Sequence, residues 1–253
     1  MKISLVQYDP KWEDPEGNQA EIRKLLDSYG PETDLLVFPE LTLTGFTMKP
    51  EKYSAAPGEG YTSFFASIAK EKGAYVVFGE IIREGERYLN TLRILDRNGT
   101  RRSNYYKIHP FSYGDENKHY SGGTELVMSD IDGIKTGFSI CYDLRFPELY
   151  RFYGKEKGEI LINIANWPIT RIEHWRTLLK ARAIENQAFV VGVNRTGKDP
   201  QLQYNGCSSI FNPMGEELCC IVDDVEIRTI EIDLGMVQEV RKKFPFLEDI
   251  KLI

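Results

Sequence analysis

One cysteine of this chain, Cys141, stands where an apolar, strand-like run gives way to a helix-like run. The surrounding residues 137–148 read Gly-Phe-Ser-Ile-Cys-Tyr-Asp-Leu-Arg-Phe-Pro-Glu. A thiol at such a bend lies at a helix N-terminus, where unpaired N–H groups and the helix dipole favour the thiolate. Because the thiolate is the reactive form, the position suits a nucleophile, although a single free cysteine is more often a small buried apolar residue.

A cysteine nucleophile needs a group that accepts its proton and donors that hold the developing oxyanion. Histidine is the usual base, and the chain has three, at His109, His119 and His174. None of them lies in a recognisable Cys–His protease context, but a Cys–His pair stays open on the sequence alone.

Two charged residues also stand where strand-like runs end. Glu40 follows the apolar residues 35–38 and a proline, at the sheet edge where α/β folds bind ligands, so its carboxylate is suited to accept and return a proton. Lys107, within residues 105–110, is a candidate for a positioned cation. Taken singly, Glu40 also reads as a capping or ion-paired residue, and Lys107 as a surface lysine. The placement that they share with Cys141 favours a catalytic interpretation.

Alternating strand and helix patterns must position these residues. Strands are predicted at residues 2–8, 34–38, 74–82, 89–96, 104–108, 160–165, 188–194, 208–211, 217–222 and 226–232, with two short ones around residues 132–133. Helices are predicted after a cap at Asn18 and over residues 62–72, 146–157, 172–187 and 237–243, while residues 110–124 read as a loop. Many central strands are apolar on both faces, which predicts one α/β domain over residues 1–253, with two packed sheets clad by helices.

Composition excludes several classes of protein. The net charge is −6 and Lys and Arg are scattered, which argues against nucleic acid as a partner. No apolar run reaches membrane-spanning length and the N-terminus lacks the apolar core of a signal peptide, so a cytoplasmic protein is expected. Cys207, Cys219 and Cys220 form no zinc-type or CxxC spacing with Cys141. A strand would point Cys219 and Cys220 to opposite faces, as reduced core thiols.

Seven segments resemble the nitrilase superfamily of carbon–nitrogen hydrolases, in the family's order and over nearly the whole chain. They are Phe-Pro-Glu at 38–40 with Gly-Phe at 45–46, Tyr-Lys-Ile-His at 106–109, Ile-Cys-Tyr-Asp-Leu-Arg-Phe-Pro-Glu at 140–148, Asn-Ile-Ala-Asn-Trp-Pro at 163–168, His-Trp at 174–175, Lys-Ala-Arg-Ala-Ile-Glu-Asn-Gln at 180–187 and Ser-Ser-Ile-Phe-Asn-Pro-Met-Gly at 208–215. Residues 45–48 and 115–120 resemble the omega-amidase branch in particular.

The resemblance implies a four-layer α-β-β-α sandwich with a triad of Glu40, Lys107 and Cys141, and no metal or organic cofactor. Glu116 resembles a second glutamate that some members keep beside the lysine, where it would hold Lys107 or help to position the substrate; a solvated loop glutamate is the other interpretation. The resemblance also suggests homodimers that pack through the helical faces near Cys141 and residues 172–187.

The chemistry implied is the hydrolysis of a primary amide through a cysteine thioester. Cys141 would attack the carbonyl carbon while Lys107 and the backbone N–H of Tyr142 hold the oxyanion. Glu40 would pass the thiol proton to the leaving nitrogen and then activate the water that hydrolyses the thioester. The partners expected are therefore a small amide substrate and water.

Omega-amidases cleave the terminal amide of 2-oxo acid monoamides such as 2-oxoglutaramate and 2-oxosuccinamate. The carboxylate of such a substrate calls for a cation, best an arginine. Arg171 is the first candidate because it follows Trp167 and Pro168 in a loop expected to rim the pocket. Arg195 is a further candidate, whereas Arg145 is expected mainly to pair with an acid beneath the site. Phe46, Tyr113 and Trp167 are candidates for an apolar wall, with a plain core role as the alternative.

Three other functions stay open on the sequence. A relative that hydrolyses N-carbamoyl amines or another small amide would use the same triad. A non-catalytic interaction domain of the same fold would not need all three triad residues, yet all three are present. A redox thiol protein would need a resolving cysteine near Cys141, and the sequence supplies none nearby.

Overall fold

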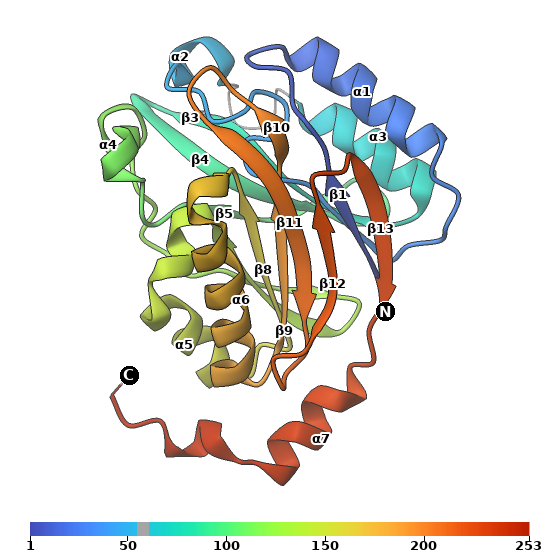
Figure 1. Cartoon of the computed structure of the whole chain (residues 1–253), viewed down its shortest axis with the longest axis vertical. Helices are drawn as coiled ribbons and strands as arrows, with labels where there is room; N and C mark the ends of the chain where they lie inside the picture. Colours follow the sequence, from blue (N-terminus) through green and yellow to red (C-terminus); the bar gives the residue numbers. More distant parts are fainter. Residues whose placement is uncertain (55–60, 253) are drawn as a thin grey trace.

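The computed structural model describes residues 1–54 and 61–252, and Figure 1 shows two β-sheets packed between two layers of helices. Helices α1 and α3 cover the outer face of one sheet, and α5 and α6 cover the other sheet. This is the four-layer α-β-β-α sandwich that the sequence predicted.

The first sheet has six strands in the order β13-β1-β2-β3-β4-β5, in which β1, β2 and β3 are parallel and the other pairs antiparallel. Its outer face buries Leu36 and Phe78 against Ile22 of α1 and Phe65 of α3. The strands are β1 (Lys2–Gln7), β2 (Leu35–Val37), β3 (Tyr75–Glu84), β4 (Arg87–Leu95), β5 (Arg101–Tyr106) and β13 (Glu226–Glu231).

The second sheet has the order β10-β11-β9-β8-β7-β6, with β12 beside β11. Its central strands β7, β8 and β9 are parallel, and β8 and β9 are buried along their whole length, as expected for strands covered on both faces. The strands are β6 (Met128–Ile131), β7 (Ile134–Ile140), β8 (Ile160–Ala165), β9 (Phe189–Asn194), β10 (Thr196–Lys198), β11 (Gln203–Phe211) and β12 (Glu217–Val222).

The α-helices are α1 (Pro15–Asp27), α2 (Pro50–Tyr53), α3 (Thr62–Lys72), α4 (Glu116–His119), α5 (Pro147–Lys155), α6 (Ile172–Asn186) and α7 (Gly235–Lys243). Short 3-10 turns are η1 (Ser112–Gly114), η2 (Cys141–Arg145), η3 (Ile169–Arg171) and η4 (Phe246–Asp249). Helix α7 and the C-terminal segment extend below the sandwich in Figure 1. Within residues 1–54 and 61–252, no helix is both long enough and apolar enough to span a bilayer.

Several predicted boundaries were wrong for identifiable reasons. Helix α1 begins four residues earlier than expected, because the Asp14 carboxylate accepts from the N–H of Gly17 at 3.0 Å and forms the cap. Asn18 instead lies buried inside the helix, where its Nδ2 donates to the carbonyl oxygens of Lys11 and Leu43, each at 2.8 Å. Residues 110–124, predicted as a loop, contain the short helical turns η1 and α4. Strand β10 and the first half of β11 were not predicted.

Candidate active site

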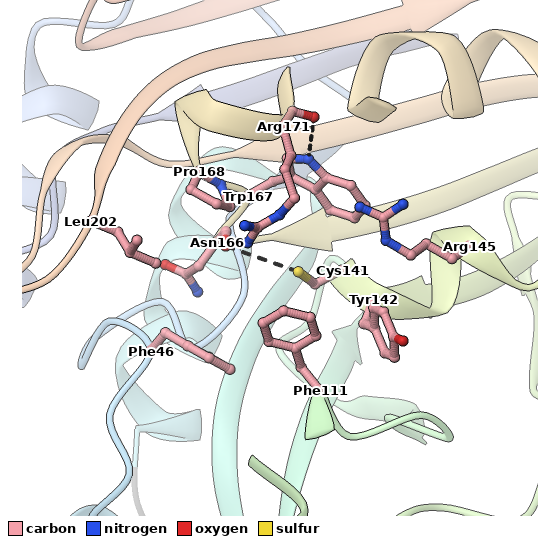
Figure 2. Close-up of a pocket in the computed structure, with 10 residues that line it drawn as sticks. All are labelled: Phe46, Phe111, Cys141, Tyr142, Arg145, Asn166, Trp167, Pro168, Arg171 and Leu202. Carbon is pink, nitrogen blue, oxygen red and sulfur yellow. Dashed lines mark hydrogen bonds between the residues drawn. The ribbon is translucent and has the colours of Figure 1, made fainter. Parts of the chain in front are cut away.

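A sharp turn between β7 and η2 places Cys141. Its backbone has φ +46°, a left-handed conformation that costs a non-glycine residue on the order of 1–3 kcal/mol. The Cys141 N–H donates to Asn163 Oδ1 at 3.1 Å. The Asn163 amide is itself fixed, because its Nδ2 donates to Ser139 Oγ at 2.8 Å and to the Tyr150 hydroxyl at 3.1 Å. These buried hydrogen bonds offset the strain and hold the thiol in a pocket (Figure 2).

Glu40 lies three residues beyond β2, where the chain bends close over β3. A Cβ at Gly79 of β3 would lie 2.3 Å from the Leu41 nitrogen, so only glycine permits this approach. The buried Glu40 carboxylate is fixed from the second sheet, because the Asn166 N–H donates to its Oε2 at 2.9 Å. Asn166 Nδ2 also donates to the Glu40 carbonyl oxygen at 2.8 Å. Glu40 therefore joins the ends of β2 and β8, one from each sheet.

Lys107 directly follows β5, and its buried ammonium lies between two carboxylates. Its Nζ donates to Glu40 Oε1 at 2.8 Å and to Glu116 Oε1 and Oε2 at 3.1 and 2.9 Å. The ammonium also lies 5.3 Å from the centroid of the Phe46 ring. Burial alone would lower the pKa of Lys107, but the charges of Glu116 and Glu40 raise this pKa well above its ordinary value. The two carboxylates therefore favour the charged form of Lys107.

Glu116, at the start of α4, completes this cluster. Its Oε2 accepts from the Phe111 N–H at 2.6 Å. Asn90 Nδ2 bridges the two glutamates, donating to Glu40 Oε1 at 2.7 Å and to Glu116 Oε1 at 2.9 Å. Burial raises the pKa of Glu116. The charge of Lys107 lowers this pKa, and the charge of Glu40 raises it further. Asn90 and Glu116 thus keep Lys107 and Glu40 in one geometry.

The surroundings of Cys141 do not favour the thiolate, which the sequence had led us to expect from a helix N-terminus. Burial and the charge of Glu40 raise the pKa of Cys141 well above its ordinary value, and Lys107 opposes them only in part. The turn that follows, η2, is a five-residue 3-10 turn rather than an α-helix, so the helix-dipole effect that was expected to favour a thiolate is outweighed. A thiol with a raised pKa holds its proton more tightly, so a base must take that proton when Cys141 attacks.

Ten residues line the pocket that opens onto the thiol, with an empty volume of about 390 Å³. Figure 2 shows Cys141 at its centre, between Arg171 on one side and Phe111 on the other. The Trp167 indole N–H donates to the Arg171 carbonyl oxygen at 2.8 Å, which fixes the rim. The lining residues are Phe46, Phe111, Cys141, Tyr142, Arg145, Asn166, Trp167, Pro168, Arg171 and Leu202.

Two arginines of this pocket lack an acidic partner. The Arg145 guanidinium lies 4.8 Å from the centroid of the Trp167 ring, and Arg145 Nη2 lies 3.2 Å from His174 Nδ1. The Arg171 guanidinium lies 5.7 Å from the centroid of the Phe111 ring. Among the described residues, no Asp or Glu forms an ion pair with either side chain. The expectation that Arg145 pairs with an acid beneath the site is therefore wrong, and both guanidiniums are available to an anion.

The other sequence candidates divide between pocket, rim and core. Phe46, Trp167 and Tyr142 line the pocket. Tyr113 does not, because its side chain is 87% exposed and lines an outer hollow that shares Phe46, Phe111 and Leu202 with the pocket. Arg195 is fully buried, and its Nη2 donates to Asp9 Oδ1 at 2.7 Å, so it belongs to the core.

None of the three histidines lines the pocket with Cys141, and the charged groups that act on this thiol are Glu40, Lys107 and Glu116, so the structure favours Glu40 over a histidine as the base. His119 borders the outer hollow and His174 contacts Arg145. His109 stacks on the Phe146 ring with centroids 3.6 Å apart.

Asp143, which the sequence did not single out, connects the two segments that carry Cys141 and Lys107. Its Oδ2 accepts from the Ile140 N–H at 3.0 Å and from the Tyr105 hydroxyl at 2.7 Å. Its Oδ1 accepts from the His109 N–H at 3.0 Å and lies 2.8 Å from His109 Nδ1. The carboxylate is fully buried, so this pairing satisfies its charge with four hydrogen-bonding partners.

Asn90, Asn163 and Asn166 were also not assigned roles from the sequence. Each interrupts or follows an apolar strand and is buried. A buried amide must find partners, so an asparagine in such a run was an available signal. Its partners, however, come from other strands and could not be inferred from one of them.

The geometry brings a buried carboxylate and a buried ammonium close to a thiol that lines the pocket, and two guanidiniums without an acidic partner lie in the wall of that pocket. Such a set can deprotonate the thiol, stabilise an oxyanion and hold an anionic ligand. No cluster of three or more metal-ligating side chains is found in residues 1–54 and 61–252.

Comparison with known proteins identifies the family of the chain. The model of the carbon–nitrogen hydrolase family matches residues 2–242. A 2-oxoglutaramate amidase of Bacillus subtilis (strain 168) is 35% identical over 98% of this chain and 97% of its own length. The omega-amidase YafV of Escherichia coli (strain K12) is 32% identical over 98% of this chain and 96% of its own.

Solved structures agree with this assignment. XC1258 from Xanthomonas campestris, a CN-hydrolase superfamily protein crystallised with an arsenic adduct in its active site, is 31% identical. It superposes with a TM-score of 0.94 and covers 100% of this chain and 98% of its own. The chain therefore belongs to the carbon–nitrogen hydrolase family, whose fold it shares.

Proposed function

We propose that the protein hydrolyses the terminal amide of a small monoamide that carries a carboxylate, of the 2-oxoglutaramate or 2-oxosuccinamate type, to the acid and ammonia. One observation carries the proposal. Arg145 and Arg171, without acidic partners, lie in the pocket that contains Cys141. A carboxylate bound by these guanidiniums would place the other end of a short substrate at the thiol.

Attack by Cys141 would begin the reaction. Glu40 takes the thiol proton as the sulfur bonds to the amide carbon, and the carbonyl oxygen becomes an oxyanion. Lys107 and the backbone N–H of Tyr142 stabilise that oxyanion, and such pre-placed donors contribute about 2.7–4 kcal/mol each in measured cases. Because the pKa of Cys141 is raised, we propose that Glu40 takes the thiol proton in the same step as the attack, so that no free thiolate accumulates.

Glu40 would then serve twice more. It returns the proton to the nitrogen, so ammonia leaves and a thioester remains on Cys141. It next removes a proton from the water that attacks the thioester, and the acid is released. Asn90, Asn166 and Lys107 keep the Glu40 carboxylate in place throughout.

The substrate class follows from charge and size. The space at the thiol is small, and the walls supplied by Phe46, Phe111 and Trp167 suit a short carbon chain. Relatives named 2-oxoglutaramate amidase and omega-amidase, at 31–35% identity, support the same class.

The test is ammonia release from a panel of compounds, with the Cys141→Ala protein as the control. 2-Oxoglutaramate and 2-oxosuccinamate are expected to release ammonia only with the unmodified protein. Turnover of an N-carbamoyl amine without turnover of either monoamide would favour the carbamoyl alternative. Equal ammonia release by the Cys141→Ala protein would contradict the catalytic assignment itself.

We also propose that residues 1–253 act as one hydrolase domain and that two copies pair through the outer faces of α5 and α6. The family match over residues 2–242 supports the first proposal. Phe152 and Ile184, 37% and 47% exposed on those helices, support the second. Comparison of the sedimentation coefficients of the protein and of an Ile184→Glu variant tests the pairing. A charge at position 184 should dissociate the dimer.

A further inference from the structure

Two cysteines outside the candidate active site lie together on neighbouring strands. Cys207 is on β11 and Cys220 is on β12, which pair antiparallel, and Cys220 is the register partner of Ser209, two residues after Cys207. The two thiols lie close enough for each to shift the pKa of the other. Neither residue lines the pocket of Cys141. We propose that Cys207 and Cys220 form a redox-active dithiol, which closes to an intramolecular disulfide when a hydroperoxide oxidises it.

A β-bulge brings the two side chains together. Ser209 is the register partner of Cys220, and the register shifts between Gly206 and Ser208, so Cys207 is the extra residue of the bulge. Its backbone has φ +56°, and bulges of this kind change the direction of a side chain relative to a regular strand. Trp175 Nε1 donates to the Cys207 carbonyl oxygen at 2.8 Å, which fixes the bulge.

The two thiols differ in access and in acidity, as a reacting pair should. Cys220 is half-buried, whereas Cys207 is only 4% exposed. The hydrogen bond from Cys207 lowers the pKa of Cys220 to about 7, despite its burial and the nearby charge of Glu217. The same contact and burial raise the pKa of Cys207. Cys220 is thus the accessible thiolate, and Cys207 is the protected partner that resolves it.

The charged neighbours of the pair are themselves fixed. Arg176 of α6 forms an ion pair with Glu217 at 2.7 Å, and Ser209 Oγ donates to Glu217 Oε1 at 3.0 Å. The charge of Arg176 lowers the pKa of Cys220, in opposition to Glu217. Because Arg176, Glu217 and Ser209 are bound to one another, the charges around the two thiols have fixed positions beside β11 and β12.

The reaction balances with hydrogen peroxide as the oxidant. The Cys220 thiolate attacks one peroxide oxygen, the O–O bond breaks, and the other oxygen leaves as water after it takes a proton. The Cys207 sulfur then attacks the sulfenic sulfur of Cys220, the S–S bond forms, and the S–O bond breaks with release of a second water. Both sulfurs together lose two electrons, which reduce the peroxide. A small thiol such as dithiothreitol returns the pair to its reduced form by exchange.

Cys219 is a matched control supplied by the chain itself. It adjoins Cys220 on β12, but it pairs in register with Ile210 and is only 9% exposed. Burial raises the pKa of Cys219 to about 11. The expectation that Cys219 and Cys220 point to opposite faces of a strand fits this difference, since successive side chains alternate. Cys219 should therefore not join Cys207.

The test uses two full-length variants that lack the catalytic thiol. Cys141→Ala/Cys219→Ser keeps Cys207 and Cys220, and Cys141→Ala/Cys220→Ser keeps Cys207 and Cys219. Each is treated with hydrogen peroxide, alkylated with iodoacetamide and weighed intact, with and without dithiothreitol. The first should lose the mass of two hydrogen atoms, take no alkyl group and regain both thiols on reduction. The second should keep alkylatable thiols.

Fragment mapping of the single Cys141→Ala variant removes any dependence on the other substitutions. Trypsin leaves residues 199–228 as one peptide that contains all three cysteines, but cyanogen bromide cuts it at Met214. After oxidation, the two halves should stay linked until they are reduced. The proposal is overturned if they separate, if Cys220 gains oxygen without a link, if the link joins two molecules, or if both double variants close equally.

Discussion

Replacement of Asp143 tests how much the reaction depends on the positions of Cys141 and Lys107, because Asp143 holds the segments that carry them and takes no part in the chemical steps. Both of its oxygens accept from a backbone N–H, Oδ2 from Ile140 and Oδ1 from His109, each at 3.0 Å. In an Asp143→Asn variant one of these positions becomes an NH₂ group. The Tyr105 hydroxyl and the His109 ring can reverse their roles as donor and acceptor, but a backbone N–H cannot. One backbone donor must therefore face another donor, whichever way the amide turns.

The size of the effect follows from that mismatch. A donor left without an acceptor in the interior costs about 1–3 kcal/mol, which urea unfolding should report as lost stability. Ile140 precedes Cys141, and His109 lies two residues after Lys107, so relief of the clash moves the thiol relative to the ammonium. Because a displacement of about 1 Å can cost about 100-fold in rate, we expect kcat to fall by about 10- to 100-fold with little change in KM.

Tyr105→Phe is the matched control, because it removes one donor to Asp143 and leaves both backbone bonds in place. It should cost about 0.5–1.5 kcal/mol of stability and change kcat little. Steady-state ammonia release and urea unfolding of both variants make the comparison. A normal kcat in Asp143→Asn, or an equal loss of kcat in Tyr105→Phe, would refute the reasoning.

Three further predictions concern the pocket and its charges. In Glu40→Gln the pKa of the Cys141 thiol should fall, because a negative charge that raises this pKa is removed. The thiolate absorbance should therefore appear at lower pH, although amide hydrolysis is lost. An unchanged titration of the thiol would contradict the interaction between Glu40 and Cys141. Arg171→Ala and Arg145→Ala should each raise KM for 2-oxoglutaramate by about 10- to 150-fold, equivalent to about 1.5–3 kcal/mol; kinetics with butyramide, which lacks the carboxylate, should not change, and an equal loss there would contradict the role. Leu202→Ala should join the pocket to the outer hollow and favour longer monoamides by about fourfold per added methylene; a chain-length series of kcat/KM that keeps its wild-type order would contradict this role for Leu202.

The fold and the principal residues could be predicted because their signals are local. Glu40, Lys107 and Cys141 each stand just after a strand, and the ends of β2, β5 and β7 bring the three side chains close together. The strand β8 was predicted with its observed bounds because its residues form a short apolar run, interrupted only by Asn163. Such patterns can be read along the chain without knowledge of what packs against them.

The properties that could not be predicted depend on groups brought together from distant segments. The raised pKa of the Cys141 thiol results from burial and from the charge of Glu40, which is 101 positions away in the sequence. Asn90 bridges Glu40 and Glu116 only because β4 lies beside β3 and β5. Arg145 was expected to have an acid beneath it, but its neighbours are Trp167 and His174. The sequence alone does not reveal these contacts.

The central claim is that Cys141 carries the acyl group during amide hydrolysis, and acid quenching during turnover tests it most directly. The protein is mixed with excess 2-oxoglutaramate, quenched within the first turnovers and digested, and the mass of the peptide that contains Cys141 is measured. We expect that peptide to gain the mass of the substrate minus ammonia, as a thioester. Continued ammonia release with an unmodified Cys141 peptide, or from the Cys141→Ala protein, would contradict the claim.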